Sequence, residues 1–177
     1  MRIVRWWTLL SVLGLVCLSA GEPRALAQKV KNVETVGQYL ARLFKKPAFA
    51  PLREPDRVEA LPVQIIGAGL SSTFRVVEKP VALDAQTMGG LRKALLNTQS
   101  YGGFTACMFT PGVALRFHNG AQSVQAVICF MCGEVIFQDA AGRDLSSRLT
   151  IGEARKPLLA AARKAFPKDE ALRELPE

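Results

Sequence analysis

The sequence predicts an α+β fold, in which an antiparallel β-meander sheet carries helices on one face. In the middle of the chain, short apolar runs follow one another and are separated by tight-turn residues, as in strands joined by hairpins. Amphipathic segments before, between and after these runs have apolar residues at helical spacing. The expected order is helix, two strands, helix, a meander of three or four strands, and a last helix. Strands joined by short turns pair antiparallel, which gives the α+β class.

The strongest hairpin signal is Asn119-Gly120, because a two-residue type I′ turn needs positive φ at both positions. A turn at these residues would place His118 opposite Ala121. Leu115 would then face Val124, and one face of the hairpin would be nearly all apolar. The other face would carry Arg116 and be solvated or under polar cover. A slip of one residue would turn the apolar set outward, so the pattern supports this assignment of faces.

The first 27 residues have the features of a secretory signal peptide. Arginines near the N-terminus precede an apolar run from Trp6 to Ala20, and small residues stand before a cut after Ala27. A cut after Ala20 also fits the pattern. The run is short for a bilayer span, so we expect no stable membrane anchor after cleavage. The mature protein is expected to be periplasmic or secreted.

The remaining chain is long enough for one domain with a hydrophobic core. Residues 28–62 are expected to form an N-terminal helix, capped by Asn32, and a proline-rich linker or extended segment from Pro47 to Pro62. Residues 63–168 are expected to form a single α+β domain. Residues 169–177 are expected to be a frayed, charged tail.

Composition excludes a nucleic-acid-binding surface. The chain holds 23 basic and 15 acidic residues, but the charges are spread along it. Both tryptophans lie in the predicted signal peptide, and few aromatic residues remain for base stacking. The expected partner is therefore a protein or a small molecule whose identity the sequence does not reveal.

Cys107, Cys129 and Cys132 are expected to lie at one end of the sheet. Residues 129–133 resemble the knuckle turn of zinc ribbons and rubredoxins, which implies that three thiolates hold zinc or copper, with a fourth ligand from Glu134, water or another chain. In an oxidising compartment, however, Cys107 would pair with Cys129 or Cys132 and leave one cysteine unpaired. The sequence favours this structural disulfide, with no cofactor.

A thiol-redox role is the other alternative for the cysteines. The Cys129-x-x-Cys132 motif precedes a strand rather than opening a helix, and no nearby lysine, arginine or histidine would stabilise a thiolate. His118, near the hairpin tip, is expected to be solvated, and no catalytic residue is predicted. The sequence therefore predicts an exported, non-catalytic binding or structural domain stabilised by a disulfide. A thiolate metal-binding or thiol-redox protein is the alternative.

Overall fold

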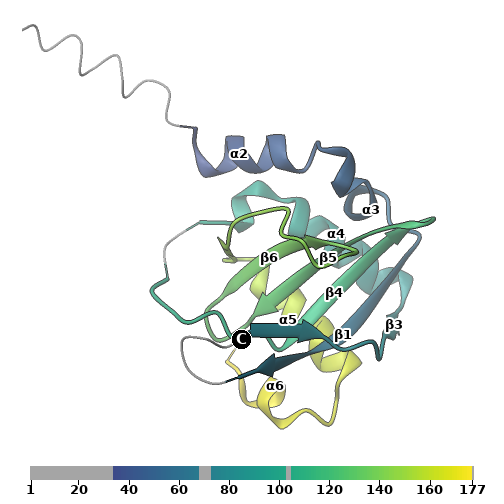
Figure 1. The fold of residues 1–177 in the computed structure, drawn as a ribbon, viewed down its shortest axis with the longest axis vertical. Coiled ribbons are helices and arrows are strands. Elements are labelled where there is room, and N and C mark those ends of the chain that lie inside the picture. Colours follow the sequence, from purple (N-terminus) through teal and green to yellow (C-terminus); the bar gives the residue numbers. More distant parts are fainter. Residues whose placement is uncertain (1–33, 68–72, 103–104, 177) are drawn as a thin grey trace, which may run out of the picture. The chain divides into compact units, whose positions relative to one another are not determined.

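In a computed structural model of the chain, a curled antiparallel sheet is combined with helices, which confirms the α+β class (Figure 1). The structure describes residues 34–67, 73–102 and 105–176, and the predicted signal peptide lies outside them. The elements are α2 (Val36–Leu43), η2 (Pro47–Phe49), α3 (Ala50–Arg53), β1 (Arg57–Ile66), β2 (Thr73–Val76), β3 (Val81–Leu83), α4 (Ala85–Leu96), η4 (Thr98–Ser100), β4 (Val113–Asn119), β5 (Gln122–Cys129), β6 (Glu134–Asp139), β7 (Leu149–Thr150), α5 (Arg155–Ala165) and α6 (Glu170–Glu174).

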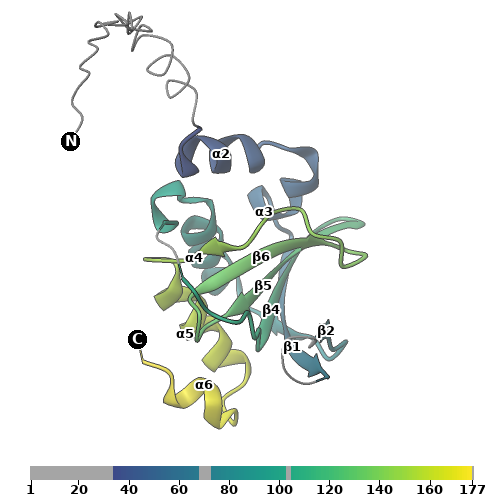
Figure 2. The ribbon, with the colours of Figure 1, turned by 60° about the vertical axis from the view of Figure 1, so that its left-hand side comes forward.

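The sheet has seven strands in the order β2-β1-β4-β5-β6-β7, and β3 also pairs with β1. Strands β4 to β7 form the predicted meander. The long strand β1 pairs with β3 through its first half and with β2 through its second half. Residues 77–80, which include Pro80, separate these two short strands along the edge of β1. Figure 2 shows β2 on the side of the sheet away from α4 and α5.

The β4–β5 register corrects the predicted turn by one residue. Asn119 pairs with Gln122, so the turn residues are Gly120, with φ of 56°, and Ala121. Every predicted pair is displaced by two positions, and Phe117 faces Val124 instead of Gln122. The assignment of faces still holds, because side chains alternate with a period of two.

Contacts with the segment before β1 explain this choice of turn. The Gly120 N–H donates to the carboxylate of Asp56 at 2.6 Å. The Asn119 side chain donates to the carbonyl of Glu54 at 2.7 Å. Both bonds need Asn119 as the last residue of β4, so a distant segment overrides the local preference of the Asn-Gly pair.

The N-terminal segment is part of the domain core. The N-cap of α2 is Thr35, which forms a capping box with Gln38. The segment from Pro47 to Pro62, expected to be a linker or extended, contains η2, α3 and the first residues of β1. Phe49 lies in it and is fully buried.

The C-terminal part of the chain is helical beyond the expected last helix. Strand β7 ends at Thr150, and α5 begins at Arg155. Pro157 lies in the first turn of α5, where a missing N–H breaks no helical hydrogen bond. The tail expected to be frayed forms α6, and Leu172 of that helix is buried.

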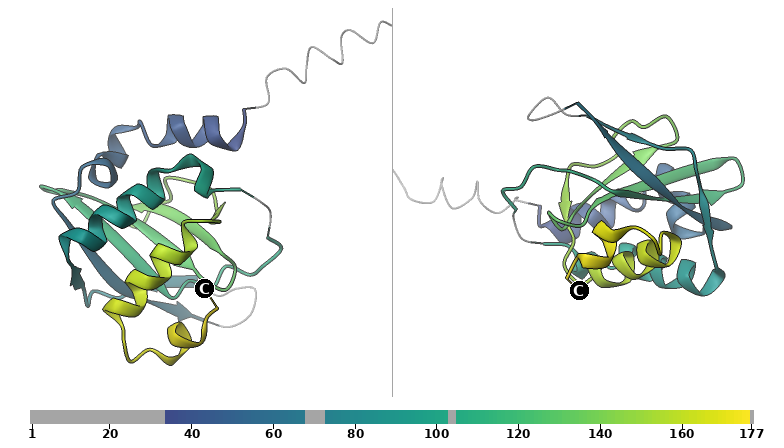
Figure 3. Two further views of the ribbon diagram at one scale, coloured as in Figure 1. Left: turned by 180° about the vertical axis from the view of Figure 1, so that it is seen from behind. Right: turned by 90° about the horizontal axis from the view of Figure 1, so that it is seen from below.

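One face of the sheet packs against the helices and forms the main core. Figure 3 (left) shows α4 and α5 side by side across this face. The residues that join the helices to the sheet are all buried in one cluster: Leu40, Leu91, Leu158, Val58, Leu115, Val124 and Phe137. Phe137 meets Phe44 and Phe49 edge-on, with ring centroids 5.6 Å and 5.4 Å away. Such geometry adds to the stabilisation from burial alone.

Replacing Phe137 with alanine is expected to lower the free energy of unfolding by about 3–5 kcal/mol, because it removes a buried ring and leaves a cavity. Urea unfolding followed by circular dichroism measures this loss. Phe74→Ala, at a half-buried ring on the other face, is the control and should cost clearly less. Equal losses would contradict the placement of the core.

Candidate functional site

The face of the sheet away from the helices carries a row of polar side chains. The strand registers place Glu59 beside Arg116, Arg116 beside Gln125, and Gln125 beside Gln138. An isolated bridge then pairs Gln138 with Asp144. Because directly paired residues in a sheet point to the same face, these residues form a line across β1, β4, β5, β6 and the segment beyond.

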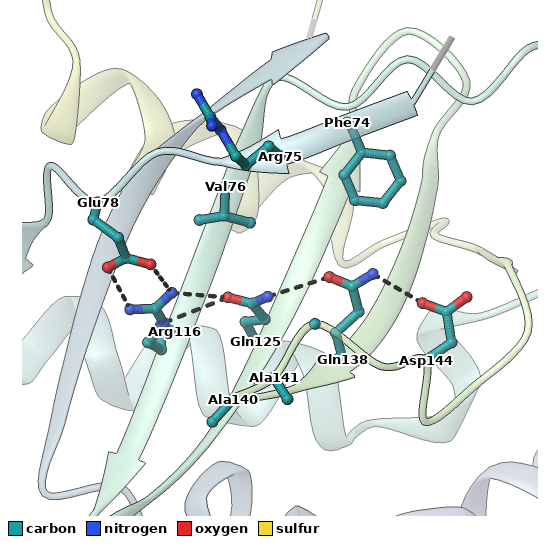
Figure 4. Close-up of a pocket in the computed structure, with 11 residues that line it drawn as sticks. Phe74, Arg75, Val76, Glu78, Arg116, Gln125, Gln138, Ala140, Ala141 and Asp144 are labelled. Atoms are coloured by element: carbon teal, nitrogen blue, oxygen red, sulfur yellow. Dashed lines mark hydrogen bonds and ion pairs between the residues drawn. The ribbon is translucent and has the colours of Figure 1, made fainter. Parts of the chain in front are cut away.

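Hydrogen bonds connect this line from a cation to an anion (Figure 4). Arg116 donates to Gln125 Oε1 at 3.3 Å, and Gln125 Nε2 donates to Gln138 Oε1 at 3.2 Å. Gln138 Nε2 then donates to Asp144 Oδ1 at 2.8 Å. All donors point the same way, so the bonds polarise one another. We call Glu78, Arg116, Gln125, Gln138 and Asp144 the polar row.

Glu78 and Arg116 form the charged end of the polar row. Two guanidinium nitrogens of Arg116 donate to the two carboxylate oxygens of Glu78, at 2.9 Å and 2.7 Å. This paired geometry is the strongest form of the arginine–carboxylate interaction. The hydrogen bonds from Arg116 lower the pKa of Glu78 below its ordinary value. Glu78 therefore stays ionised at neutral pH.

The polar row is the floor of a cleft of about 610 Å³. Phe74 and Val76 of β2 point toward the row from one side, and the turn at residues 140–142 lines the other side (Figure 4). Arg75 also borders the cleft, but its side chain points away from the polar row (Figure 4). The cleft exists because β1 curls. The second half of β1 carries β2 over the face of the sheet that the helices leave open.

The expectation that His118 is solvated, which rested on its place near the hairpin tip, was wrong. Only 12% of its side chain is exposed, and its Nε2 lies 2.9 Å from a carboxylate oxygen of Glu59. Its Nδ1 lies 3.1 Å from the guanidinium of Arg57. Burial alone would raise the pKa of Glu59, but hydrogen bonds and charges from His118 and Arg57 outweigh it and lower that pKa.

Three cysteines, Cys107, Cys129 and Cys132, meet at one end of the sheet, and we call them the cysteine corner. Cys107 and Cys132 form a disulfide with their Cα atoms 5.6 Å apart, and Cys129 is a buried free thiol. This pairing is one of the two that the sequence left open. Among residues 34–67, 73–102 and 105–176, no group of three metal-ligating side chains is present. Zinc or copper binding by Cys107, Cys129 and Cys132 stays a prediction for the reduced protein, since disulfide sulfurs are not thiolates.

Glu134, expected as a fourth metal ligand, lies beside the cysteine corner. Thr105 Oγ1 donates to its Oε1 at 2.8 Å. Its Oε2 is buried without a hydrogen-bond partner, and the guanidinium of Arg148 is 3.7 Å away. Arg148 also approaches the carbonyl oxygen of Cys107, at 3.4 Å. No cation beside the cysteines was expected from the sequence, because Arg148 is 41 residues from Cys107 in the chain.

Comparison of the chain with protein-family models, curated proteins and solved structures gave no match. Within the described part of the chain, no helix has both the length and the apolar character needed to cross a bilayer.

We expect the contribution of Glu59 to the free energy of unfolding to decrease as the pH is lowered. A carboxyl group with a lowered folded-state pKa stabilises the protein above its unfolded-state pKa, and this stabilisation is lost as the pH falls through the folded-state value. We expect Glu59→Gln to be less stable than the native chain at about pH 6, and the difference to shrink toward about pH 3. Urea unfolding across this range measures it. A difference independent of pH would show that Glu59 is not held ionised by His118 and Arg57.

Proposed function

We propose that the mature protein is an exported binding domain whose open-face cleft takes a small, neutral, polar ligand and has no catalytic role. The observation that carries this proposal is the polar row, a continuous line of hydrogen-bonding groups along the floor of a cleft. Small-molecule sites commonly combine such convergent polar groups with apolar walls.

The two amides of the polar row provide the donors for the ligand. Gln125 and Gln138 are only 4% and 6% exposed, and the hydrogen bonds along the row hold them in place. An amide nitrogen carries two N–H donors, and each glutamine uses one of them within the row. The second N–H of each amide is the group we assign to ligand carbonyl or hydroxyl oxygens.

The charges and walls of the cleft favour a neutral ligand with an apolar face. Arg116 is paired with Glu78, and Asp144 accepts from Gln138, so the charged groups of the floor are engaged within the row rather than free to attract an ion. Phe74 and Val76 offer apolar surface above the polar floor. A carbohydrate or a short uncharged peptide backbone has this combination of groups.

Binding fits the acidic groups of the cleft better than catalysis does. Glu78 is engaged by Arg116, and Asp144 accepts from Gln138. The lowered pKa of Glu78 keeps it from donating a proton near neutral pH. The disulfide is compatible with an oxidising compartment, and we propose the periplasm or the extracellular space on the strength of the predicted signal peptide.

The test is an NMR titration of the ¹⁵N-labelled mature protein with two neutral probes, the disaccharide N,N′-diacetylchitobiose and the peptide trialanine. Binding of either probe should shift the side-chain amide signals of Gln125 and Gln138. Gln125→Met and Gln138→Met keep an unbranched side chain but remove the N–H donors, so each should weaken binding about tenfold or more. Gln86→Met, at an exposed position of α4, is the matched control and should leave binding unchanged.

Two results would overturn the proposal. One is the absence of any shift at Gln125 and Gln138 with both probes at millimolar concentration. The other is binding that Gln125→Met and Gln86→Met affect equally, which would place the ligand elsewhere.

A further inference from the structure

The buried thiol of Cys129 is placed against one half of the disulfide. The backbone N–H of Cys132 donates to Cys129 Sγ at 3.3 Å, so this sulfur lies close to the Cys132 side chain. The two residues are three apart across the turn between β5 and β6. Such turns bring Cα atoms within about 7 Å, the range that a disulfide can span. Cys129 and Cys132 are therefore able to pair without a large movement of the backbone.

A proton acceptor stands next to this thiol. Glu134 is the direct cross-strand partner of Cys129, so the two side chains point to the same face. Glu134 Oε1 is occupied by Thr105, whereas Oε2 is buried, has no hydrogen-bond partner and lies 3.7 Å from the guanidinium of Arg148. Cys129 has no exposed surface, and we assign the role of its proton acceptor to Glu134, its cross-strand neighbour.

A cation stands next to the other half of the disulfide. Arg148 Nη1 lies between Cys107 and Glu134, 3.4 Å from the backbone carbonyl oxygen of Cys107 and 3.7 Å from Glu134 Oε2, and Cys107 itself is exposed to solvent. A neighbouring guanidinium stabilises a thiolate, and so does water. Cys107 is therefore the better leaving group of the disulfide, and Cys132, which is buried, is the sulfur that Cys129 can reach.

We propose that the cysteine corner is a thiol–disulfide exchange relay that acts on the disulfides of other polypeptides. Cys129 gives its proton to Glu134, and its sulfur attacks Cys132 Sγ. A Cys129–Cys132 disulfide forms, the Cys107–Cys132 bond breaks, and the bonding electrons leave with Cys107 as a thiolate. One disulfide and one thiol are present before and after the step, so it needs no oxidant or reductant. The Cys107 thiolate then attacks a substrate disulfide, forms a mixed disulfide with one substrate sulfur and releases the other as a thiolate.

The surface around the disulfide suits a polypeptide substrate. Met108 follows Cys107 and is 55% exposed, and Met131 precedes Cys132 and is 82% exposed. These are two of the four exposed large hydrophobic residues of the described chain. Methionine side chains are flexible and polarisable, and they adapt to varied apolar partners. The relay should therefore prefer disulfides flanked by apolar residues.

Alkylation of the native protein by iodoacetamide, followed by peptide mass spectrometry, tests the relay. Among residues 34–67, 73–102 and 105–176, the resting structure has one free thiol, the buried Cys129. The relay predicts carbamidomethylation of Cys107, together with a Cys129–Cys132 disulfide. Label found on Cys129, or no label until the protein is unfolded, would overturn the proposal. This test does not involve the open-face cleft, so its result is independent of the ligand-binding proposal.

Variants separate the role of each group. Cys129→Ala keeps the Cys107–Cys132 disulfide but removes the attacking sulfur, so labelling of Cys107 should disappear. Glu134→Gln keeps an acceptor for Thr105 but is a far weaker base, and it should slow labelling of Cys107 at least tenfold. Glu153→Gln, at an exposed position, is the matched control and should label at the native rate. An unchanged rate in Glu134→Gln, with native circular dichroism, would remove Glu134 from the relay.

The substrate preference is tested with two disulfides, oxidised glutathione and a disulfide-linked peptide dimer that carries leucine beside its cysteine. The mixed disulfide at Cys107 should form several-fold faster with the peptide dimer than with oxidised glutathione. Met131→Ser should remove most of this difference while iodoacetamide labelling of Cys107 stays at the native rate. Equal rates for both disulfides in the native chain would show that the methionines do not select the substrate.

Discussion

The antiparallel register of β1, β4, β5 and β6 is the constraint on which the rest of the structure depends. It places Val58, Leu115, Val124 and Phe137 toward the helices, and it places the central members of the polar row, Arg116, Gln125 and Gln138, on the opposite face. A slip of one residue between β4 and β5 would exchange these two sets, expose the apolar side chains and bury Arg116 without Glu78. The core and the cleft are thus two results of the same set of strand pairings.

The fold class and the faces of the central hairpin were predictable from the sequence, because period-two alternation is a local property. The exact register was not, since Asp56 and Glu54 select the turn from more than 60 residues away. A hint was present in the sequence. The predicted register left Phe117 opposite a glutamine, whereas a displacement by two positions gives it a valine partner. The burial of Phe49 was not predicted either, because the prolines on both sides of it suggested a linker rather than part of the core.

The two candidate sites differed in how far the sequence revealed them. The placement of strand and turn predicted that Cys107, Cys129 and Cys132 meet at one end of the sheet, but it left open which of the other two Cys107 pairs with. The polar row was missed because its members come from five separate segments, and only Arg116 and Gln125 lie on the polar face of the predicted hairpin. Glutamines within apolar strands, such as Gln125 and Gln138, were the available signal, since a buried amide needs hydrogen-bond partners. The position of Arg148 beside Cys107 was not predicted, because the two residues are far apart in the sequence and meet only in the folded chain.

The interruption between β2 and β3 has a consequence for how this sheet behaves at high concentration. A long, flat outer strand is a template on which other chains add, which leads to aggregation. Here the outer edge beside β1 is divided by Glu78, Lys79 and Pro80, and proline offers no N–H to an incoming strand. The opposite edge, β7, is two residues long. Within the described residues the sheet presents only short edges, so the chain is protected against strand addition by the same segment that holds Glu78 over the cleft.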